Sequence, residues 1–405
     1  MRQLLTMTLA AMVALPTLAD INTPETEATN GNPDITTGQS GAINAPASEF
    51  RTEETYEEGF LTSYLNESIE KGMESLDQNA EKEYGRKVTK YASAPKFAGY
   101  FMSGYWYSGK EGAHSGDGFK VKNVRAIVSG SILGDFNYLL QLQLTNASFH
   151  VKDYWLEWKK YKEFSVKAGQ FIRVFGYENP YNPFEFHEHS YAQITQKLCG
   201  QADRVSEDNG GGRDQGIQIQ GDLLPASDGH RYLHYQVMLS NGQTINSADK
   251  NSQKDISGSI AVQPIDGLRL AVWGWTGNFT GSNGVTVNRN RYMFSAFYDK
   301  NDWTVRAEYA HSQGGKLEDI TDDQAQGWYA TVGVPMGKIV KTWFKYDAYQ
   351  DHATKDVQKT IWSVAPQIAL HKNLYFLPTF GYVFDKTLAG TAKYCEASMQ
   401  MAVRF

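Results

Sequence analysis

The carboxy-terminal stretch Lys393-Tyr-Cys-Glu-Ala-Ser-Met-Gln-Met-Ala-Val-Arg-Phe405 decides how this chain folds. Every second residue counted back from Phe405 is apolar, and the residues between them are mostly polar. A period of two is typical of a β-strand with one apolar and one polar face. Such a strand fits a soluble sheet, and it also fits a barrel wall that has lipid on one side and water on the other. The apolar set is Val403, Met401, Met399, Ala397 and Cys395.

The same alternation starts at Phe97 and recurs to the end of the chain, which predicts an all-β fold. Tight links such as Gly134-Asp135 alternate with long links such as Asn241 to Gln253. This asymmetry, together with the aromatic terminus, predicts a transmembrane antiparallel up-and-down β-barrel of about 16 strands over residues 96–405. An even number of strands places both ends of the barrel on the short-turn, periplasmic side. The candidate strands cover about 97–107, 119–133, 136–147, 151–160, 164–175, 214–224, 231–240, 254–264, 268–276, 290–299, 302–312, 327–334, 338–350, 357–370, 373–385 and 392–405.

The composition agrees with a barrel. Aromatic residues make up 13% of the chain, which suits rings of Tyr, Phe and Trp at the two membrane interfaces. The mean hydropathy of -0.49 fits the absence of a run of 18 apolar residues after residue 20, so no membrane-spanning helix is predicted. A barrel strand needs only half of its residues to be apolar.

The amino-terminal quarter has a different character. Residues 1–19 have the basic start, apolar centre and small-residue end of a signal peptide. Residues 20–95 form an acidic extension, and the part from 21 to 90 holds 14 acidic and 6 basic residues against 30 and 32 in residues 91–405. Within the extension, apolar residues at spacings of three and four predict an amphipathic helix at about 57–86. This helix could contact its own copies in an oligomer, the barrel or another envelope component, or it could be a solvated spacer.

Two cysteines and a His-x-His motif were considered as sites. Cys199 and Cys395 lack the spacing of a redox or metal motif, and a disulfide between them is allowed but not indicated. His187 and His189 are flanked by glutamates, but without a third placed ligand we predict no metal and no cofactor.

The link from Gly176 to Arg213 is far longer than the others. Its 38 residues exceed an ordinary loop, and it carries five Tyr and Phe residues, too many for a solvated tail. We therefore expect this loop to fold into the barrel and to narrow it.

Four segments carry a resemblance to a known family. They are Phe119-Lys-Val-Lys-Asn-Val-Arg-Ala-Ile-Val-Ser-Gly130, Asp153-Tyr-Trp-Leu-Glu-Trp158, Ala168-Gly-Gln-Phe-Ile-Arg-Val-Phe175 and Gly212-Arg-Asp-Gln-Gly-Ile-Gln. In order and spacing they resemble the phosphate-selective porin O/P family of outer-membrane proteins. The resemblance implies a homotrimeric porin, embedded in outer-membrane lipid, that favours small anions such as phosphate. It implies no nucleic-acid partner.

Strand parity selects candidate residues for an anion path, because rings of Arg and Lys set anion selectivity. If the apolar parity faces lipid, then Arg125, Lys167 and Arg173 face the interior, with Val166, Ala168, Ile172 and Val174 outside. Arg306 with Glu308, and Lys345 with Asp347, are expected to be structural partners. The predicted pore-lining or anion-binding residues are Arg125, Lys167, Arg173, Arg204, Arg213, Lys341 and Lys345.

The sequence therefore favours a passive diffusion channel for small hydrophilic solutes, and two other classes stay open. One is a structural or surface-interaction barrel whose contact element is the helix at 57–86. The other is a barrel enzyme such as a lipase or protease. The neighbours His189 and Ser190 are its best candidates, although adjacency in sequence is not a catalytic arrangement.

Overall fold

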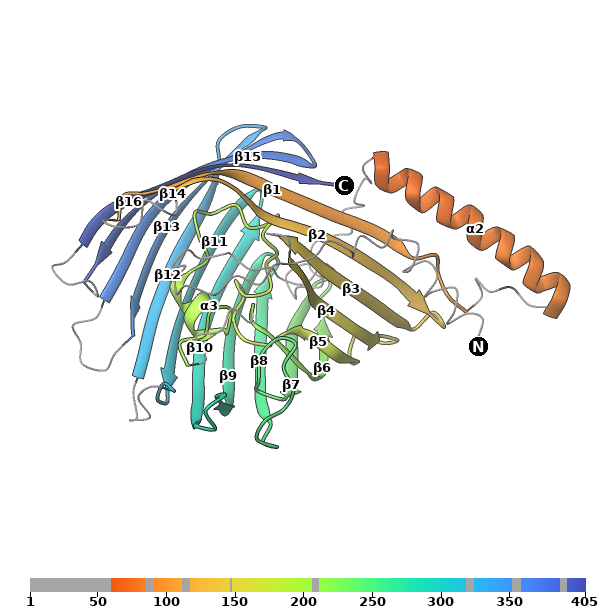
Figure 1. The fold of residues 1–405 in the computed structure, drawn as a ribbon, viewed down its shortest axis with the longest axis horizontal. Helices are drawn as coiled ribbons and strands as arrows, with labels where there is room; N and C mark the ends of the chain where they lie inside the picture. Colours follow the sequence, from red (N-terminus) through yellow and green to blue (C-terminus); the bar gives the residue numbers. More distant parts are fainter. Residues whose placement is uncertain are drawn as a thin grey trace, which may run out of the picture. The chain divides into compact units, whose positions relative to one another are not determined.

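The structure is a computed structural model that describes residues 60–84, 87, 91–110, 117–145, 148–205, 211–317, 324–351, 358–386 and 392–405 (Figure 1). All of these belong to one compact unit, Thr37–Phe405. The predicted signal peptide and the first part of the acidic extension lie outside the described residues. Within the described part, no helix is both long enough and apolar enough to cross a membrane.

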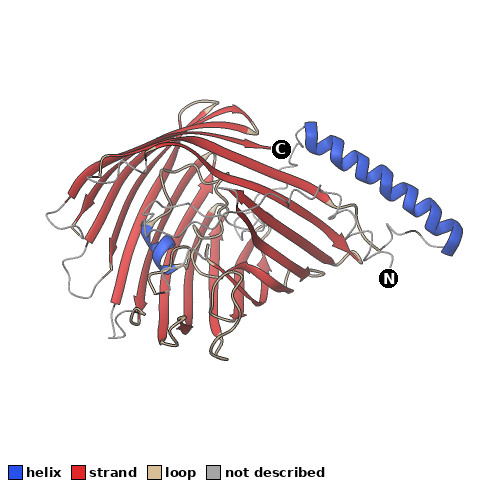
Figure 2. Ribbon diagram, in the orientation of Figure 1, coloured by secondary structure: helices blue, strands red, loops and turns tan. Residues whose placement is uncertain are grey.

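Strands dominate the fold and close on themselves (Figure 2). Each strand pairs antiparallel with its neighbour in sequence, and β1 pairs with β16, which closes the barrel. The prediction of a 16-stranded antiparallel barrel is confirmed. The strands are β1 (Lys96–Ser108), β2 (Gly118–Ile132), β3 (Phe136–Thr145), β4 (Ser148–Trp158), β5 (Ser165–Ile172), β6 (Arg213–Pro225), β7 (Arg231–Ser240), β8 (Asp255–Ile265), β9 (Leu268–Thr280), β10 (Thr286–Lys300), β11 (Trp303–Gln313), β12 (Gln324–Pro335), β13 (Val340–Gln350), β14 (Gln358–His371), β15 (Leu374–Asp385) and β16 (Ala392–Arg404).

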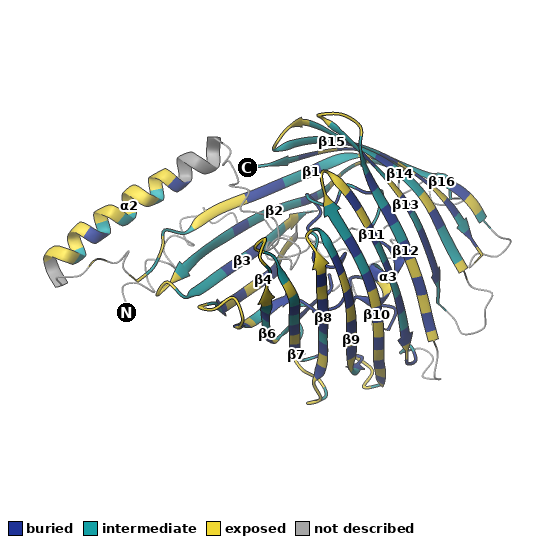
Figure 3. Ribbon diagram, turned by 180° about the vertical axis from the view of Figure 1, so that it is seen from behind, coloured by how far each residue is buried: buried dark blue, intermediate teal, exposed yellow. Residues whose placement is uncertain are grey.

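The last strand shows how the alternating sequence builds the wall. In β16 the side chain of Met399 is 63% exposed, whereas its neighbours Ser398 and Gln400 are 5% and 3% exposed. The same alternation of exposed and buried residues runs along β8 to β12 (Figure 3). The apolar set therefore points outward, and the polar set points into the barrel, as the period of two predicted.

Tight turns join the strands at one end. Between β10 and β11 the two residues Asn301 and Asp302 have φ values of 54° and 64°. Positive φ at both central residues gives the type I′ turn, whose twist matches that of a β-hairpin. Asn and Asp tolerate this left-handed conformation better than most residues, which explains the pair in this turn.

Strand β5 is shorter than predicted. Its pairing with β4 stops at Gln170 and its pairing with β6 stops at Ile172. The chain then enters the barrel, so Ile172 and Val174 are 8% and 5% exposed instead of facing lipid, which corrects the parity assignment. The backbone of β4 that β5 leaves is satisfied by side chains. Gln170 donates to the Lys152 carbonyl at 2.9 Å and Asn246 to the Val151 carbonyl at 3.1 Å.

The described part of the long loop after β5 packs against the inner face of the wall and contains the short helix α3 (Gln193–Leu198). Its apolar residues Val174, Phe175, Tyr177, Ile194 and Leu198 form one cluster with inward residues of the wall. These wall residues include Met238, Trp273, Trp275, Met293, Ala310, Ala325 and Tyr329. The loop therefore packs on an apolar patch of the inner wall.

The amphipathic helix predicted at about 57–86 is present as α2 (Phe60–Tyr84). Ile69, Met73, Leu76 and Ala80 of its apolar stripe are half-buried, whereas most residues between them are exposed. The existence of the helix is confirmed, and its role stays a prediction.

Candidate functional site

Buried ion pairs fasten the inward loop to the wall. Arg291 of β10 donates to both carboxylate oxygens of Asp203 in the loop, at 2.6 and 2.9 Å, and to the Leu198 carbonyl at 2.7 Å. The side chains of Arg291 and Asp203 are 0% and 1% exposed. Burial opposes ionisation of the Asp203 carboxyl, but the charge and hydrogen bonds of Arg291 hold its pKa well below its usual range. Arg291 therefore binds the loop to the wall through a bidentate contact with Asp203.

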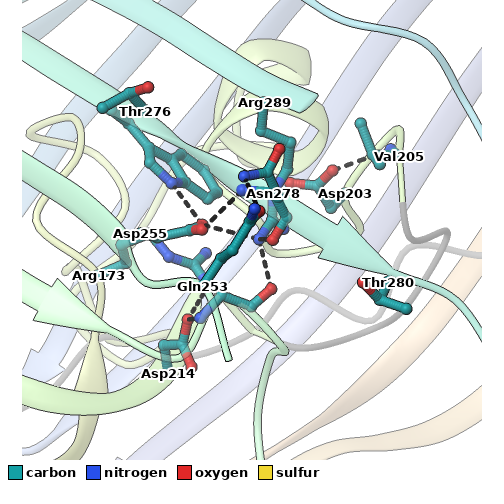
Figure 4. Close-up of polar contacts among 12 residues, drawn as sticks. Arg173, Asp203, Val205, Asp214, Gln253, Asp255, Thr276, Asn278, Thr280 and Arg289 are labelled. Carbon is teal, nitrogen blue, oxygen red and sulfur yellow. Dashed lines mark hydrogen bonds and ion pairs between the residues drawn. The ribbon is translucent and has the colours of Figure 1, made fainter. Parts of the chain in front are cut away.

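Three arginines of such pairs surround the ring of Trp275. Figure 4 labels Arg173, Arg289, Asp203, Asp214 and Asp255 of this set. The guanidinium carbons of Arg173, Arg289 and Arg291 lie 4.2, 4.8 and 4.5 Å from its ring centre. Arg173 donates to Asp214 at 2.8 Å, and Arg289 donates to Asp255 at 2.8 Å. Asp203 accepts from Arg291. Each of these three arginines is therefore matched by one carboxylate, so this cluster anchors the loop and adds no net charge.

A second anchor holds the middle of the loop. Glu178 and Glu188 face Lys345 of β13 and Arg306 of β11. Lys345 Nζ lies 2.6 Å from Glu178 Oε1 and 3.1 Å from Glu188 Oε2, and Arg306 bonds Glu188. The prediction that Arg306 pairs with Glu308, and Lys345 with Asp347, is therefore wrong. Both cations instead bind glutamates of the loop.

The wall carboxylates Glu308 and Asp347 accept hydrogen bonds from backbone amides of the loop. Glu308 accepts from the Tyr177 amide at 2.8 Å, and Asp347 accepts from the Gln193 amide at 2.9 Å. The wall therefore holds the loop through charges and through backbone amides.

Two further predicted site residues are neutralised in the same way. Arg204 donates to Asp351 at 2.9 Å and to the Gly314 carbonyl at 2.9 Å. Arg213 forms a two-pronged bond with Asp153, at 3.0 and 2.7 Å. Both arginines are at most 3% exposed, so they are structural parts of the wall and loop in this arrangement.

Arg125 differs from the paired arginines. It is 0% exposed, and its Nη1 donates to the Gln141 side chain at 3.2 Å. Its Nε and Nη2 have no hydrogen-bond acceptor among the described residues. Arg213 and Lys152 lie close enough to interact electrostatically, with Asp153 as the acidic neighbour. This part of the wall therefore carries excess positive charge beneath its surface.

Lys167 and Lys341 point inward, as strand parity predicted. Lys167 is 5% exposed, and its ammonium group lies 4.9 Å from the Trp155 ring centre and 5.5 Å from that of Phe171. Lys341 is half-buried and donates to the Thr304 hydroxyl at 2.9 Å. Among the predicted site residues, Lys341 is the one with substantial exposure.

Three half-exposed lysines that were not predicted from the sequence lie on the part of the wall formed by β14, β16, β1 and β2. Lys120 lies opposite Gly104, which in turn lies opposite Gln400. Lys122 reaches across the same glycine and donates to the Gln400 side chain at 3.4 Å. Lys359 of β14 interacts electrostatically with Glu396. Parity alone could have found Lys359, but a register shift between Met102 and Ser103 changes the parity of β2.

The histidine and cysteine candidates also have defined places. His189 contacts the Thr379 hydroxyl through Nδ1 at 3.0 Å and Glu396 through Nε2 at 3.2 Å. Neither ring nitrogen therefore binds Ser190. Cys199 and Cys395 are both free thiols. Cys199 is fully buried in the loop, where burial raises the pKa of its thiol well above the usual value.

Comparison with known proteins identifies the fold. No protein-family model matches the chain, and no curated protein matches it significantly, so membership in the phosphate-selective porin family stays a prediction. An anion-selective porin from Comamonas acidovorans is 13% identical with a TM-score of 0.58, over 77% of this chain and 99% of that one. OmpF from Salmonella typhi, solved with daunomycin, is 11% identical with a TM-score of 0.55, over 77% and 97%. DcaP, an outer-membrane channel of Acinetobacter baumannii, is 9% identical with a TM-score of 0.51, over 77% and 97%. The barrel therefore has the fold of bacterial outer-membrane porins.

Proposed function

We propose that the protein is an outer-membrane porin, a passive diffusion channel for small hydrophilic solutes and not an enzyme. The observation that carries this proposal is the closed barrel with apolar residues outside, charged residues inside and a long loop fastened within it. A closed sheet leaves no unpaired edge in lipid, and the inward loop would set the width of the path. The porin fold supports the same function.

The proposed selectivity is for anions, including phosphate-like oxyanions. The arginines around Trp275 are matched by carboxylates, so they contribute little net field. The excess positive charge comes from Arg125 beneath the wall and from the half-exposed lysines Lys120, Lys122 and Lys359. Cations along a pore raise the local concentration of anions.

The predicted pore-lining residues would then act in two ways. Arg125 would act through its field, since it is too deeply buried to touch a hydrated solute. Arg173, Arg204, Arg213 and Lys345 would act by holding the loop that shapes the path. We also propose a homotrimer in outer-membrane lipid, with the acidic extension in the periplasm.

Recordings on purified protein in planar bilayers test this function. We expect discrete conductance steps and a reversal potential that shows anion preference in a KCl gradient. Changing Lys122 and Lys359 together to Glu should shift the reversal potential toward cations, whereas the same change at exposed Lys300, at the end of β10, should not. A protein that folds into bilayers without conducting would instead favour a structural barrel.

A further inference from the structure

A chain of hydrogen-bonded side chains crosses the inner wall where the long loop meets β15 and β16. One member of the chain, His189, belongs to the loop. It contacts the Glu396 carboxylate through Nε2 at 3.2 Å and the Thr379 hydroxyl through Nδ1 at 3.0 Å. The Thr379 and Ser398 hydroxyl oxygens lie 2.8 Å apart, and the Gln400 amide donates to Ser398 at 2.9 Å.

Both ends of this chain carry charge. At one end Lys122 donates to the last amide of the chain at 3.4 Å. At the other end Glu396 interacts electrostatically with Lys359 of β14 and with Lys110, which follows β1. The Glu396 side chain is 31% exposed, whereas that of His189 is 8% exposed. His189 is therefore a titratable group within the stretch of wall that holds the half-exposed lysines.

The neighbours of His189 have other partners. Glu188 bonds the wall cations of β11 and β13, and the His187 ring lies 4.9 Å from that of Tyr375. On the side of β15, a Cβ added at Gly381 would lie 2.6 Å from His189 Nε2, so backbone packs against the imidazole there. Among the contacts of the described residues, the Glu396 carboxylate is thus the charged group that the imidazole touches.

The contacts of His189 accommodate both charge states of the imidazole. An ionised carboxylate only accepts hydrogen bonds, so Nε2 carries a proton toward Glu396 in either state. In the neutral ring Nδ1 accepts from the Thr379 hydroxyl, and in the imidazolium it donates to the same oxygen. A hydroxyl can do either by rotating, and the Ser398 oxygen can accept the proton that Thr379 turns away. Protonation therefore adds a positive charge without breaking a contact of the loop.

We propose that the protonation state of His189 sets how strongly the channel prefers anions. Histidine is the residue type whose charge ordinarily changes between pH 5 and 8. When the imidazole is neutral, the Glu396 carboxylate offsets part of the field of Lys359 and Lys110. When it is protonated, the imidazolium cancels that carboxylate and the field of the lysines is left, so anion preference rises as pH falls. The inference rests on the proposed channel function and adds its regulation.

Reversal potentials in a KCl gradient test the proposal, recorded from purified protein in planar bilayers at pH 8 and pH 5.5. Most carboxylates stay ionised over this range. We expect the chloride-to-potassium permeability ratio to rise by about two- to fivefold, the range for a unit charge met across roughly 8 Å of water with and without screening by salt. Chloride current rises while potassium current falls, so the total conductance is the less sensitive measurement.

Two variants and a matched control assign the shift. His189→Gln removes the titratable group but keeps a side chain that can donate and accept, so its ratio should be the same at both pH values. Glu396→Gln should raise the ratio at pH 8, because the lysines lose the carboxylate that offsets them. His230→Gln should keep the full pH-dependent shift, because His230 also contacts a carboxylate, that of Asp228, but lies in the turn between β6 and β7.

The outcomes separate the inference from the function. Absence of conductance in the unmodified protein would overturn the channel proposal itself. Normal conductance with the same ratio at pH 8 and pH 5.5, with the full shift retained in His189→Gln, or with no rise at pH 8 in Glu396→Gln, would overturn the role of His189 and leave the channel standing.

Discussion

Replacing Asp203 by Asn is expected to release the long loop from the wall. Both carboxylate oxygens of the loop residue Asp203 accept hydrogen bonds from the Arg291 guanidinium. Both side chains are almost fully buried. Asn keeps the size of the side chain but removes its charge, which leaves the guanidinium of Arg291 buried without a counter-ion. Breaking a buried ion pair from one side costs about 3–5 kcal/mol.

That loss of free energy predicts a large change in loop opening. Each 1.4 kcal/mol corresponds to about a factor of ten in an equilibrium constant, so the population of the released loop should rise by about two to three and a half orders of magnitude. The loop carries its own reporter, Cys199, whose side chain is 0% exposed. In a Cys395→Ser background, Asp203→Asn should accelerate labelling of Cys199 by a water-soluble thiol reagent by a similar factor.

A matched control distinguishes loop release from general loss of stability. Asp255 pairs with Arg289 at 2.8 Å and is as deeply buried as Asp203, but its three partners, Arg289, the Trp275 indole and the Asn278 amide, all belong to the wall. Asp255→Asn should therefore leave Cys199 protected. Labelling of the Asp203 variant at the unmodified rate, or equal acceleration in both variants, would refute the assigned role of the Asp203–Arg291 pair.

Three further predictions concern the closure of the barrel, the conductance at low pH and the role of the acidic amino-terminal extension. Gly99→Val should lower the yield of folded barrel on heat-modifiability gels, because a Cβ there would lie 2.6 Å from the Arg125 carbonyl and 2.7 Å from the Phe405 ring. Gly274→Val, with open space around its Cβ, should not. The lowered pKa of Asp203 means that its contribution is present above the ordinary Asp pKa and is lost only as pH falls through the depressed value, so conductance should persist unchanged down to about pH 4. Removing residues 20–90 should weaken the oligomer in mild detergent at unchanged conductance per pore; if neither changes, α2 is a spacer.

The wall was predictable from the sequence because its determinants are local. Successive residues of a strand point to opposite sides, so Met399 and Gln400 report their environments without knowledge of any other strand. Turn residues such as Asn301 and Asp302 fix the hairpins by their own conformational preferences. Strand β5 was overextended because Ile172 and Val174 continue an apolar parity after the chain has turned inward. Both lipid and the packed interior select apolar residues, so the pattern cannot tell them apart.

The partners of the charges were not predictable because they depend on where the long loop lies. Lys345 was expected to pair with Asp347 two residues away, yet it pairs with Glu178, which is 167 residues distant in sequence. Arg306 likewise bonds Glu188 and leaves Glu308 to the loop backbone. A strand presents its inward charges to the interior, and only the path of the loop decides which of them become buried and neutralised.

The sequence nevertheless contains a trace of that path. A water-filled interior should select polar residues at every inward position, but inward positions of β9 to β12 hold Trp273, Trp275, Met293, Ala310 and Tyr329. These residues break the alternation on the polar side only, and all of them pack against the loop. On β9 to β12, apolar residues at inward parity therefore mark the footprint of the inserted loop. In β16 the inward positions between Tyr394 and Ala402 are polar, namely Glu396, Ser398 and Gln400, and we propose that the open path for solutes runs along this part of the wall.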